Sequence, residues 1–149
     1  MIDENLAWAV RYFIYQHFAA TTLPPSIAET AEQFHISLED AKAAYLDLHH
    51  RDALFLEPGT TDVRMAFPFS AVPTPFKVHA RGKTYYANCA WDSLGIPSAL
   101  HSDAVIETVC AWDGEPISLS VENGQVIHHD EIIHYLVPFR QWYNDLPFT

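Results

Sequence analysis

Two helix-start signals lie close together in the first third of the chain and constrain what it can fold into. Ser26 is followed three residues later by Glu29, which is the pattern of a capping box. Ser37 precedes the acidic pair Glu39-Asp40 and repeats the signal. Pro24-Pro25 ends the apolar helical pattern that comes before. The sequence therefore predicts three helices, over about residues 4–20, 26–34 and 37–51.

A hairpin is expected directly after these helices. Two short apolar segments, residues 53–56 and 63–67, flank the turn-forming pair Pro58-Gly59. Three helices followed by a hairpin is the element order of a winged helix-turn-helix. We therefore predict an N-terminal winged-helix-like part over residues 1–66.

The remaining chain, residues 67–149, is richer in strand and turn signals. Tight turns are predicted at Arg81-Gly82, Asp113-Gly114 and Asn123-Gly124. Strand patterns cover residues 76–80, 83–86, 104–112, 117–121 and 132–137. A short helix at Cys89 is expected to end at Gly95, with Pro97 just beyond it, and the aromatic tail at residues 138–143 is expected to dock. Residues 67–149 are thus predicted to form a mixed α+β domain with a small antiparallel sheet, which places the whole chain in the α+β class.

The charge and the apolar pattern of the chain narrow its partners. The formal net charge is −11, and both halves are acidic, so neither offers the basic footprint that nucleic acid needs. No apolar run is long enough to span a membrane, and the segment Met1–Asn5 is acidic where a signal peptide is basic. We therefore expect a cytoplasmic protein without nucleic acid or membrane partners, in which Cys89 and Cys110 stay reduced. The nine histidines, including the pairs His49-His50 and His128-His129, lack the spacing of a zinc site.

Cys89 and Asp92 are the side chains of this sequence best suited to chemistry. If Asn88 caps a short helix, Cys89 lies in the first turn and Asp92 falls on the same face, because residues three apart are neighbours on a helix. A helix N-terminus favours negative charge and lowers the pKa of a thiol placed there. A thiolate beside an acid that can carry a proton is typical of soft-metal or thiol chemistry.

The central part of the chain, from about Phe67 to Val121, resembles the alkylmercury (organomercurial) lyase family. The segments that carry this resemblance are Phe67–Ser70, Pro73–Pro75, Gly82-Lys83, Ala87–Pro97 and Cys110–Ile117. The order and spacing of these segments make the resemblance specific. The family also carries an N-terminal winged-helix-like part, which agrees with the separate prediction for residues 1–66.

The resemblance implies a reaction and assigns roles to residues. In the family, the cysteine and the aspartate of a Cys-x-x-Asp motif act in the protonolysis of a carbon–mercury bond, and they match Cys89 and Asp92. Cys110 matches a cysteine that is usually taken as structural. The family's second catalytic cysteine lies near the C-terminus and has no match after Cys110. Either it has been lost, or this sequence, which ends at Thr149, stops short of it.

The resemblance also implies what the site binds. Hg(II) is soft and prefers thiolate ligands, so mercury is expected on Cys89 both in the substrate and in the product. Asp92 is a further candidate ligand, and Cys110 is a less favoured one. No cofactor is expected, and an external small thiol would supply the second ligand or accept the product. The expected partner is a small organomercurial or another thiol-reactive ligand.

Simpler interpretations stay open beside these. Cys89 is alternatively a buried small hydrophobic residue, and Asp92 is alternatively a carboxylate that stabilises a helix N-terminus. Cys110 lies in an apolar alternating segment and is expected to pack in the core. The main alternative function is a non-catalytic protein that binds or senses a soft metal or small ligand. A winged-helix transcriptional regulator is a further alternative, against which the acidic charge argues.

Overall fold

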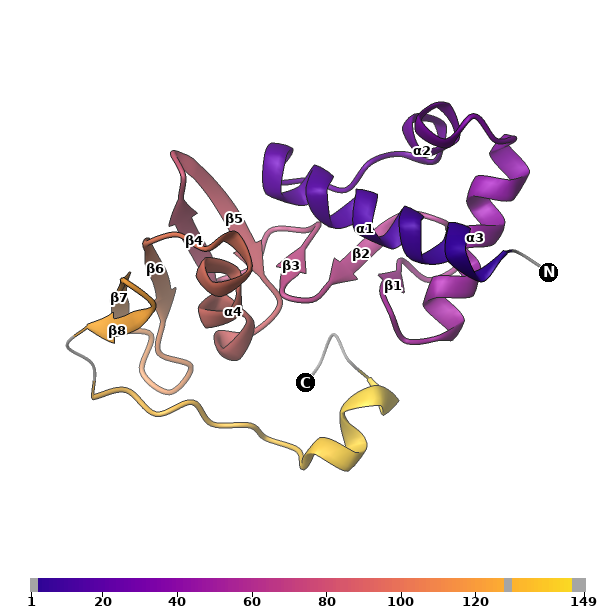
Figure 1. Cartoon of the computed structure of the whole chain (residues 1–149). Coiled ribbons are helices and arrows are strands. Elements are labelled where there is room, and N and C mark those ends of the chain that lie inside the picture. Colours follow the sequence, from indigo (N-terminus) through magenta and orange to yellow (C-terminus); the bar gives the residue numbers. More distant parts are fainter. Residues whose placement is uncertain (1–2, 128–129, 146–149) are drawn as a thin grey trace.

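The first part of the molecule is mainly helical and the rest is built around a sheet (Figure 1). The computed structural model describes residues 3–127 and 130–145. Its helices are α1 (Glu4–Thr21), α2 (Ile27–Phe34), α3 (Leu38–His50), α4 (Ala90–Leu100) and the 3-10 helix η1 (Phe139–Asn144). Its strands are β1 (Phe55–Leu56), β2 (Val63–Ala66), β3 (Phe69–Ser70), β4 (Lys77–Ala80), β5 (Lys83–Ala87), β6 (Ala104–Val109), β7 (Pro116–Glu122) and β8 (Gln125–Ile127). The predicted α+β class is confirmed, and none of the described helices is both long and apolar enough to cross a membrane.

Side chains that satisfy free backbone N–H groups start the three N-terminal helices. The Asp3 carboxylate accepts a hydrogen bond from the Asn5 N–H at the start of α1, at 2.7 Å. At α2, Ser26 and Glu29 form the predicted capping box, in which Glu29 Oε2 accepts from the Ser26 N–H at 2.7 Å. Ser37 caps α3, as predicted. The predicted order of three helices is therefore confirmed.

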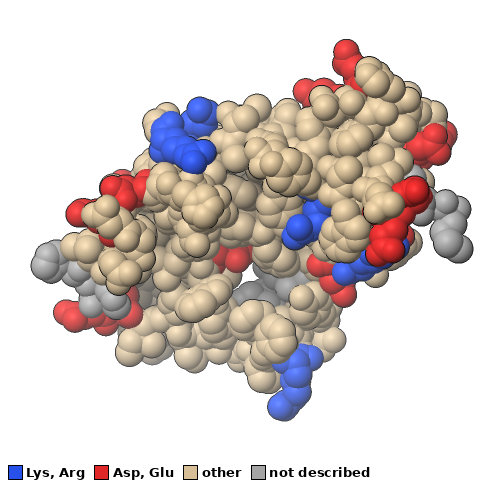
Figure 2. All heavy atoms as spheres, viewed as in Figure 1, with Lys and Arg blue, Asp and Glu red and all other residues tan. Residues whose placement is uncertain are grey.

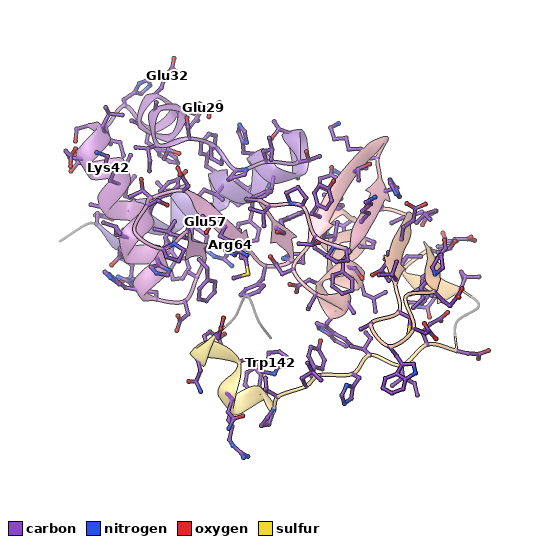
Figure 3. The ribbon with its side chains drawn as sticks, turned by 180° about the vertical axis from the view of Figure 1, so that it is seen from behind. Glu29, Glu32, Lys42, Glu57, Arg64 and Trp142 are labelled. Carbon is purple, nitrogen blue, oxygen red and sulfur yellow. The ribbon has the colours of Figure 1, made fainter. Side chains whose placement is uncertain are left out.

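All eight strands belong to one antiparallel sheet with the order β1-β2-β3-β5-β4-β6-β7-β8. The predicted hairpins are present, with β1 paired to β2 and β4 paired to β5 around Arg81-Gly82. Arg64 of β2 and Glu57 form an ion pair at 2.6 Å that stabilises the first hairpin (Figure 3). The sheet is larger than predicted because β3 joins the first hairpin to the later strands.

One hydrophobic core joins the helices to this sheet. Phe18 of α1 stacks on Phe69 of β3, with ring centroids 5.3 Å apart. Tyr85 of β5 donates a hydrogen bond to the Ala19 carbonyl at 2.8 Å. Buried residues from both sides of the predicted boundary after residue 66 contribute to this core. The division into a winged-helix-like part and a second domain remains a prediction.

Helix α4 packs on β4, β5 and β6 and continues further than predicted. The expected end at Gly95 is wrong, because the helix passes through Pro97 and ends at Leu100, where the left-handed residue His101, with φ of 48°, forms the C-cap. Gly95 allows close packing instead: a Cβ atom at this position would lie 3.1 Å from the Cβ of Pro68. Gly95 and Pro97 therefore do not mark the end of this helix.

The C-terminal part departs most from prediction. Strand β6 ends at Val109 rather than at Trp112. Residues 132–137 were predicted as a strand but have no regular structure, because the position beside β7 is taken by β8. The segment 130–145 instead runs past α4 and ends in η1 (Figure 1). There the rings of Tyr143 and Phe55 pack with their centroids 6.1 Å apart, so the aromatic tail docks as predicted. The pair His128-His129 lies outside the described residues.

Candidate active site

A cavity of about 200 Å³ lies where the C-terminal segment passes the start of α4. The surface is visibly hollowed between this segment and the rest of the molecule (Figure 2). Apolar and aromatic side chains make up most of the cavity wall, and Asn88, Cys89 and Asp92 bring polar groups to it. The remaining lining residues are Met65, Phe67, Trp91, Tyr135, Phe139, Trp142 and Tyr143.

Cys89 is the N-cap residue of α4 and is half-buried. The expectation that Asn88 is the cap is wrong by one residue. Burial raises the pKa of the Cys89 thiol, and the negative charge of Asp92 adds to this, whereas the N–H groups of Asp92 and Trp91 and the hydroxyl of Tyr135 oppose it. The net shift is upward, so the prediction that the helix N-terminus gives a lowered pKa is wrong: loss of water at the sulfur outweighs the helix N–H groups.

Asp92 lies in the first turn of α4, next to Cys89 and on the cavity wall. Burial raises the pKa of this carboxyl, and hydrogen bonds from Asn88 and from the Cys89 thiol lower it in part. The thiol therefore acts on Asp92 as a hydrogen-bond donor, not as the charged neighbour that the sequence analysis expected. A raised pKa favours the protonated form of a carboxyl, which is the form that can donate a proton.

Asn88 fixes the geometry of this pair. Its Nδ2 atom donates to Asp92 Oδ2 at 2.9 Å and lies 3.3 and 3.2 Å from the backbone carbonyl oxygens of Pro68 and Phe69. One amide thus connects the start of α4 to the loop that leads into β3. The sequence predicts only a capping role for Asn88.

Tyr15 of α1 lies close enough to Asp92 to be affected by its charge. The pKa of Tyr15 is raised mainly by burial and also by the negative charge of Asp92, and Arg11 opposes this rise. Arg11 Nη2 donates to the Tyr15 hydroxyl at 3.1 Å. The charge of Asp92 therefore reaches the side chain of Tyr15 on α1, which no motif in the sequence indicates.

Tyr135 is the cavity residue that sequence reasoning missed. It lines the cavity together with Cys89, and burial, with the nearby Cys89 sulfur and the charge of Asp92, raises the Tyr135 pKa to about 12. Its ring packs against Trp142 with centroids 4.6 Å apart. The signal was hidden because Tyr135 lies in a segment that was predicted as a strand and that reaches Cys89 only through its path past α4.

The family model for alkylmercury lyases matches residues 69–145 of this chain, which include the whole of α4 and all but two of the residues that line the cavity. The chain belongs to the alkylmercury lyase family. The resemblance stated from the sequence is thereby confirmed.

Members of the alkylmercury lyase family from several bacteria are similar to part of the chain. The alkylmercury lyases of Bacillus cereus and Clostridium butyricum are each 39% identical to it over 56 residues, which cover 38% of this chain and 26% of each relative. The alkylmercury lyase of Staphylococcus epidermidis is 32% identical over 63 residues, 42% of this chain and 29% of the relative. These matched segments thus span less than a third of the relatives' own length.

A solved structure, the mercury-bound form of MerB2, is similar in fold. It superposes with a TM-score of 0.66 at 24% sequence identity, over 85% of this chain and 60% of the MerB2 chain. At this identity the likeness supports the fold and not the roles of single residues.

Cys110, the other cysteine of this alkylmercury lyase family member, does not line the cavity. It lies in the turn between β6 and β7, where its N–H donates to the Glu115 carbonyl at 2.8 Å. Its thiol forms a hydrogen bond that lowers the pKa of the exposed Asp113 carboxyl. Cys110 is half-buried, so the expectation that it packs in the core is wrong: the strand ends one residue before it.

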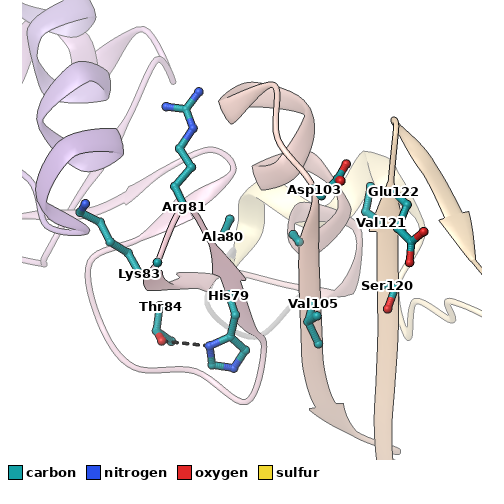
Figure 4. A pocket seen from close by; sticks show the side chains of 12 residues that line it. His79, Ala80, Arg81, Lys83, Thr84, Asp103, Val105, Ser120, Val121 and Glu122 are labelled. Atoms are coloured by element: carbon teal, nitrogen blue, oxygen red, sulfur yellow. Dashed lines mark hydrogen bonds between the residues drawn. The ribbon is translucent and has the colours of Figure 1, made fainter.

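Other groups that could bind a ligand are less suited to this chemistry. Among the described residues, no three His, Cys, Asp or Glu side chains come together as a metal site. A broad open hollow lies over β4, β6 and β7 (Figure 4), but it contains no thiol, and its His79 is already bonded to Thr84 and Glu107, each at 3.0 Å. On the face shown in Figure 2, Lys and Arg lie in small separate groups rather than in one basic patch.

Proposed function

We propose that this protein cleaves the carbon–mercury bond of organomercurials by protonolysis, with Cys89 as the mercury-binding thiolate and Asp92 as the proton donor. The observation that carries the proposal is the pairing of a thiol with a hydrogen-bonded acid of raised pKa inside one aromatic cavity. Membership in the alkylmercury lyase family supports the same reaction.

The first step is binding of the substrate to sulfur. The Cys89 sulfur displaces the weak ligand of an organomercury cation, because soft Hg(II) prefers thiolate. The thiol proton passes to the Asp92 carboxylate, to which the thiol is already hydrogen-bonded. The result is a sulfur–mercury–carbon unit on Cys89 and a neutral Asp92 carboxyl beside it. The aromatic wall, which includes Phe67 and Trp142, receives the organic substituent.

The second step breaks the carbon–mercury bond. The neutral Asp92 carboxyl gives its proton to the carbon bound to mercury, the electron pair of the Hg–C bond forms the new C–H bond, and the hydrocarbon leaves. Asp92 returns to the carboxylate. A thiolate from a small external thiol binds mercury before the bond breaks and stays on it when the hydrocarbon leaves, so Hg(II) ends with two sulfur ligands and charge is balanced.

The external thiol is needed because Cys89 is the only cysteine that lines the described cavity. Two thiolates increase the electron density on mercury and weaken the Hg–C bond more than one can. The same external thiol can then remove the Hg(II) product from Cys89. No further cofactor takes part in the proposed steps.

The test is benzene release from phenylmercury acetate in the presence of excess small thiol. We expect several turnovers for the natural sequence, none for Cys89→Ser, and a loss of roughly 10²–10⁴-fold for Asp92→Asn, the usual effect of removing a general acid. Cys110→Ser is the matched thiol control and should retain the rate, since Cys110 lies outside the cavity. Equal benzene release by the natural protein and Cys89→Ser would overturn the proposal.

A non-catalytic protein that binds soft metals is the second candidate function, and the presence of a single cysteine in the cavity wall favours it. Such a protein would bind one phenylmercury through Cys89 and release no benzene. Phenylmercury bound without turnover, by both the natural protein and Asp92→Asn, would establish this candidate instead.

A further inference from the structure

We propose that Tyr135 is a third catalytic residue of this site, whose hydroxyl donates a hydrogen bond to the Cys89 sulfur and holds it in the orientation that attacks mercury. The role deepens the proposed function and rests on it for the identity of the electrophile. The hydrogen bond itself would affect any reaction in which the Cys89 sulfur is the nucleophile.

The position of Tyr135 is defined by packing and not by chain neighbours. Most side chains around it in the segment 130–138 are exposed: Ile132 is 90% and Leu136 is 77% accessible. Tyr135 is instead half-buried and turned into the cavity. Its ring lies on Trp142, and the Trp142 indole N–H donates to the Val137 carbonyl at 3.0 Å. The ring contact with Trp142, which is labelled in Figure 3, fixes the Tyr135 ring that carries the hydroxyl.

Two polar side chains from different parts of the chain line the cavity beside Cys89. Asp92 comes from α4 and Tyr135 from the C-terminal segment, and both affect the pKa of the thiol. A sulfur held by two partners has fewer orientations available, so the lone pair that attacks mercury stays directed into the cavity. Tyr135 stabilises the thiolate while Asp92 receives the thiol proton, which gives the two groups separate roles.

Tyr135 does not replace the second thiolate. A phenol oxygen is a hard ligand, and Hg(II) selects soft sulfur. The hydroxyl also keeps its proton over the range in which the thiol reacts, since burial and nearby negative charge disfavour the phenolate. A hydrogen-bond donor is therefore the role that the chemistry of this side chain supports.

The direct test is the rate at which iodoacetamide alkylates Cys89 in the full chain with Cys110→Ser, so that one cysteine reacts. Tyr135→Phe keeps the ring on Trp142 and removes only the hydroxyl. We expect alkylation at pH 7 to slow by roughly tenfold and its pH profile to move to higher pH, because the thiolate loses a hydrogen-bond donor that stabilises it. Tyr12→Phe, which removes an exposed hydroxyl on α1, is the matched control and should leave the profile unchanged.

An alkylation rate and profile of Tyr135→Phe that equal those of Tyr12→Phe would overturn the proposal. Circular dichroism and thermal melting of both variants establish that each is folded. The alkylation test does not use an organomercurial. Failure of benzene release with the natural sequence would therefore contradict the proposed lyase reaction, while a slowed Tyr135→Phe alkylation would still establish the hydrogen bond.

Discussion

At the scale of single residues, burial decides the behaviour of the site. Cys89 and Asp92 are both withdrawn from water, and for both the loss of water raises the pKa more than the hydrogen bonds lower it. The resting pair is thus a thiol beside a carboxyl group that share hydrogen bonds. A site of this kind does not need a permanently charged thiolate, because the thiol can lose its proton to Asp92 as mercury binds.

The raised pKa of Asp92 predicts how stability depends on pH. Because the folded state binds this proton more tightly than the unfolded chain, the stabilisation is complete below the unfolded pKa of about 4 and is lost as pH rises through the higher folded value. Asp92→Asn removes the titration and keeps an acceptor for Asn88. Near neutral pH we expect Asp92→Asn to melt a few degrees higher than the natural protein. At about pH 4.5 we expect this gain in melting temperature to be smaller.

Thermal unfolding followed by circular dichroism at both pH values measures this difference. A gain for Asp92→Asn that is the same at both pH values would show that burial does not raise the pKa of Asp92.

At the scale of elements, α4 determines where the two functional side chains lie, and its packing depends on one glycine. Gly95 faces Pro68, whose carbonyl oxygen also lies 3.3 Å from Asn88 Nδ2. Replacing glycine by alanine inside a helix normally gains about 1 kcal/mol. Here the new methyl group would press on the Pro68 ring, and overpacking of this kind costs about 1–3 kcal/mol.

We therefore expect Gly95→Ala to lower the free energy of unfolding by about 1 kcal/mol, although it raises helix propensity. Ser98→Ala is a suitable control, since Ser98 is exposed on the same helix and its change affects propensity without a contact to Pro68. Urea unfolding of both variants gives the comparison. A Gly95→Ala protein that is more stable than the natural one would show that Pro68 moves away freely.

The elements were predictable where local signals define them. The capping residues Ser26 and Ser37 start α2 and α3 as predicted, and Arg81-Gly82 turns the chain between β4 and β5. Those features depend on neighbours in sequence, so a sequence pattern contains them. The end of α4 and the path of residues 132–137 depend on contacts with distant segments, and local patterns misjudged both.

The site divides in the same way. Cys89 and Asp92 are three residues apart, and their neighbourhood follows from helix geometry, so the sequence alone brought them together. Tyr135 reaches the cavity from a segment far away in the chain, and nothing in its local sequence indicates it. The sign of the Cys89 pKa shift was also missed, because burial is a property of the folded molecule.

At the scale of the whole molecule, the cavity exists because two chain segments meet. One wall comes from the β5–α4 junction with Phe67, and the other comes from the segment that contains Tyr135 and η1. Aromatic contacts join the two walls. The ring centroid of Phe55 lies 5.5 Å from that of Phe67 and 6.1 Å from that of Tyr143. The core shared by helices and sheet holds the first wall, and these aromatic contacts attach the second wall to it.

The central claim is that Cys89 binds the organomercurial and Asp92 supplies the proton that releases the hydrocarbon. Intact mass spectrometry of the protein after brief exposure to phenylmercury and small thiol tests both halves of it. With Cys110→Ser in every protein, we predict that the otherwise natural sequence carries mercury without the phenyl group, that Asp92→Asn carries phenylmercury, and that Cys89→Ser carries neither. Asp92→Asn protein that has lost the phenyl group as fast as the natural protein would contradict the account.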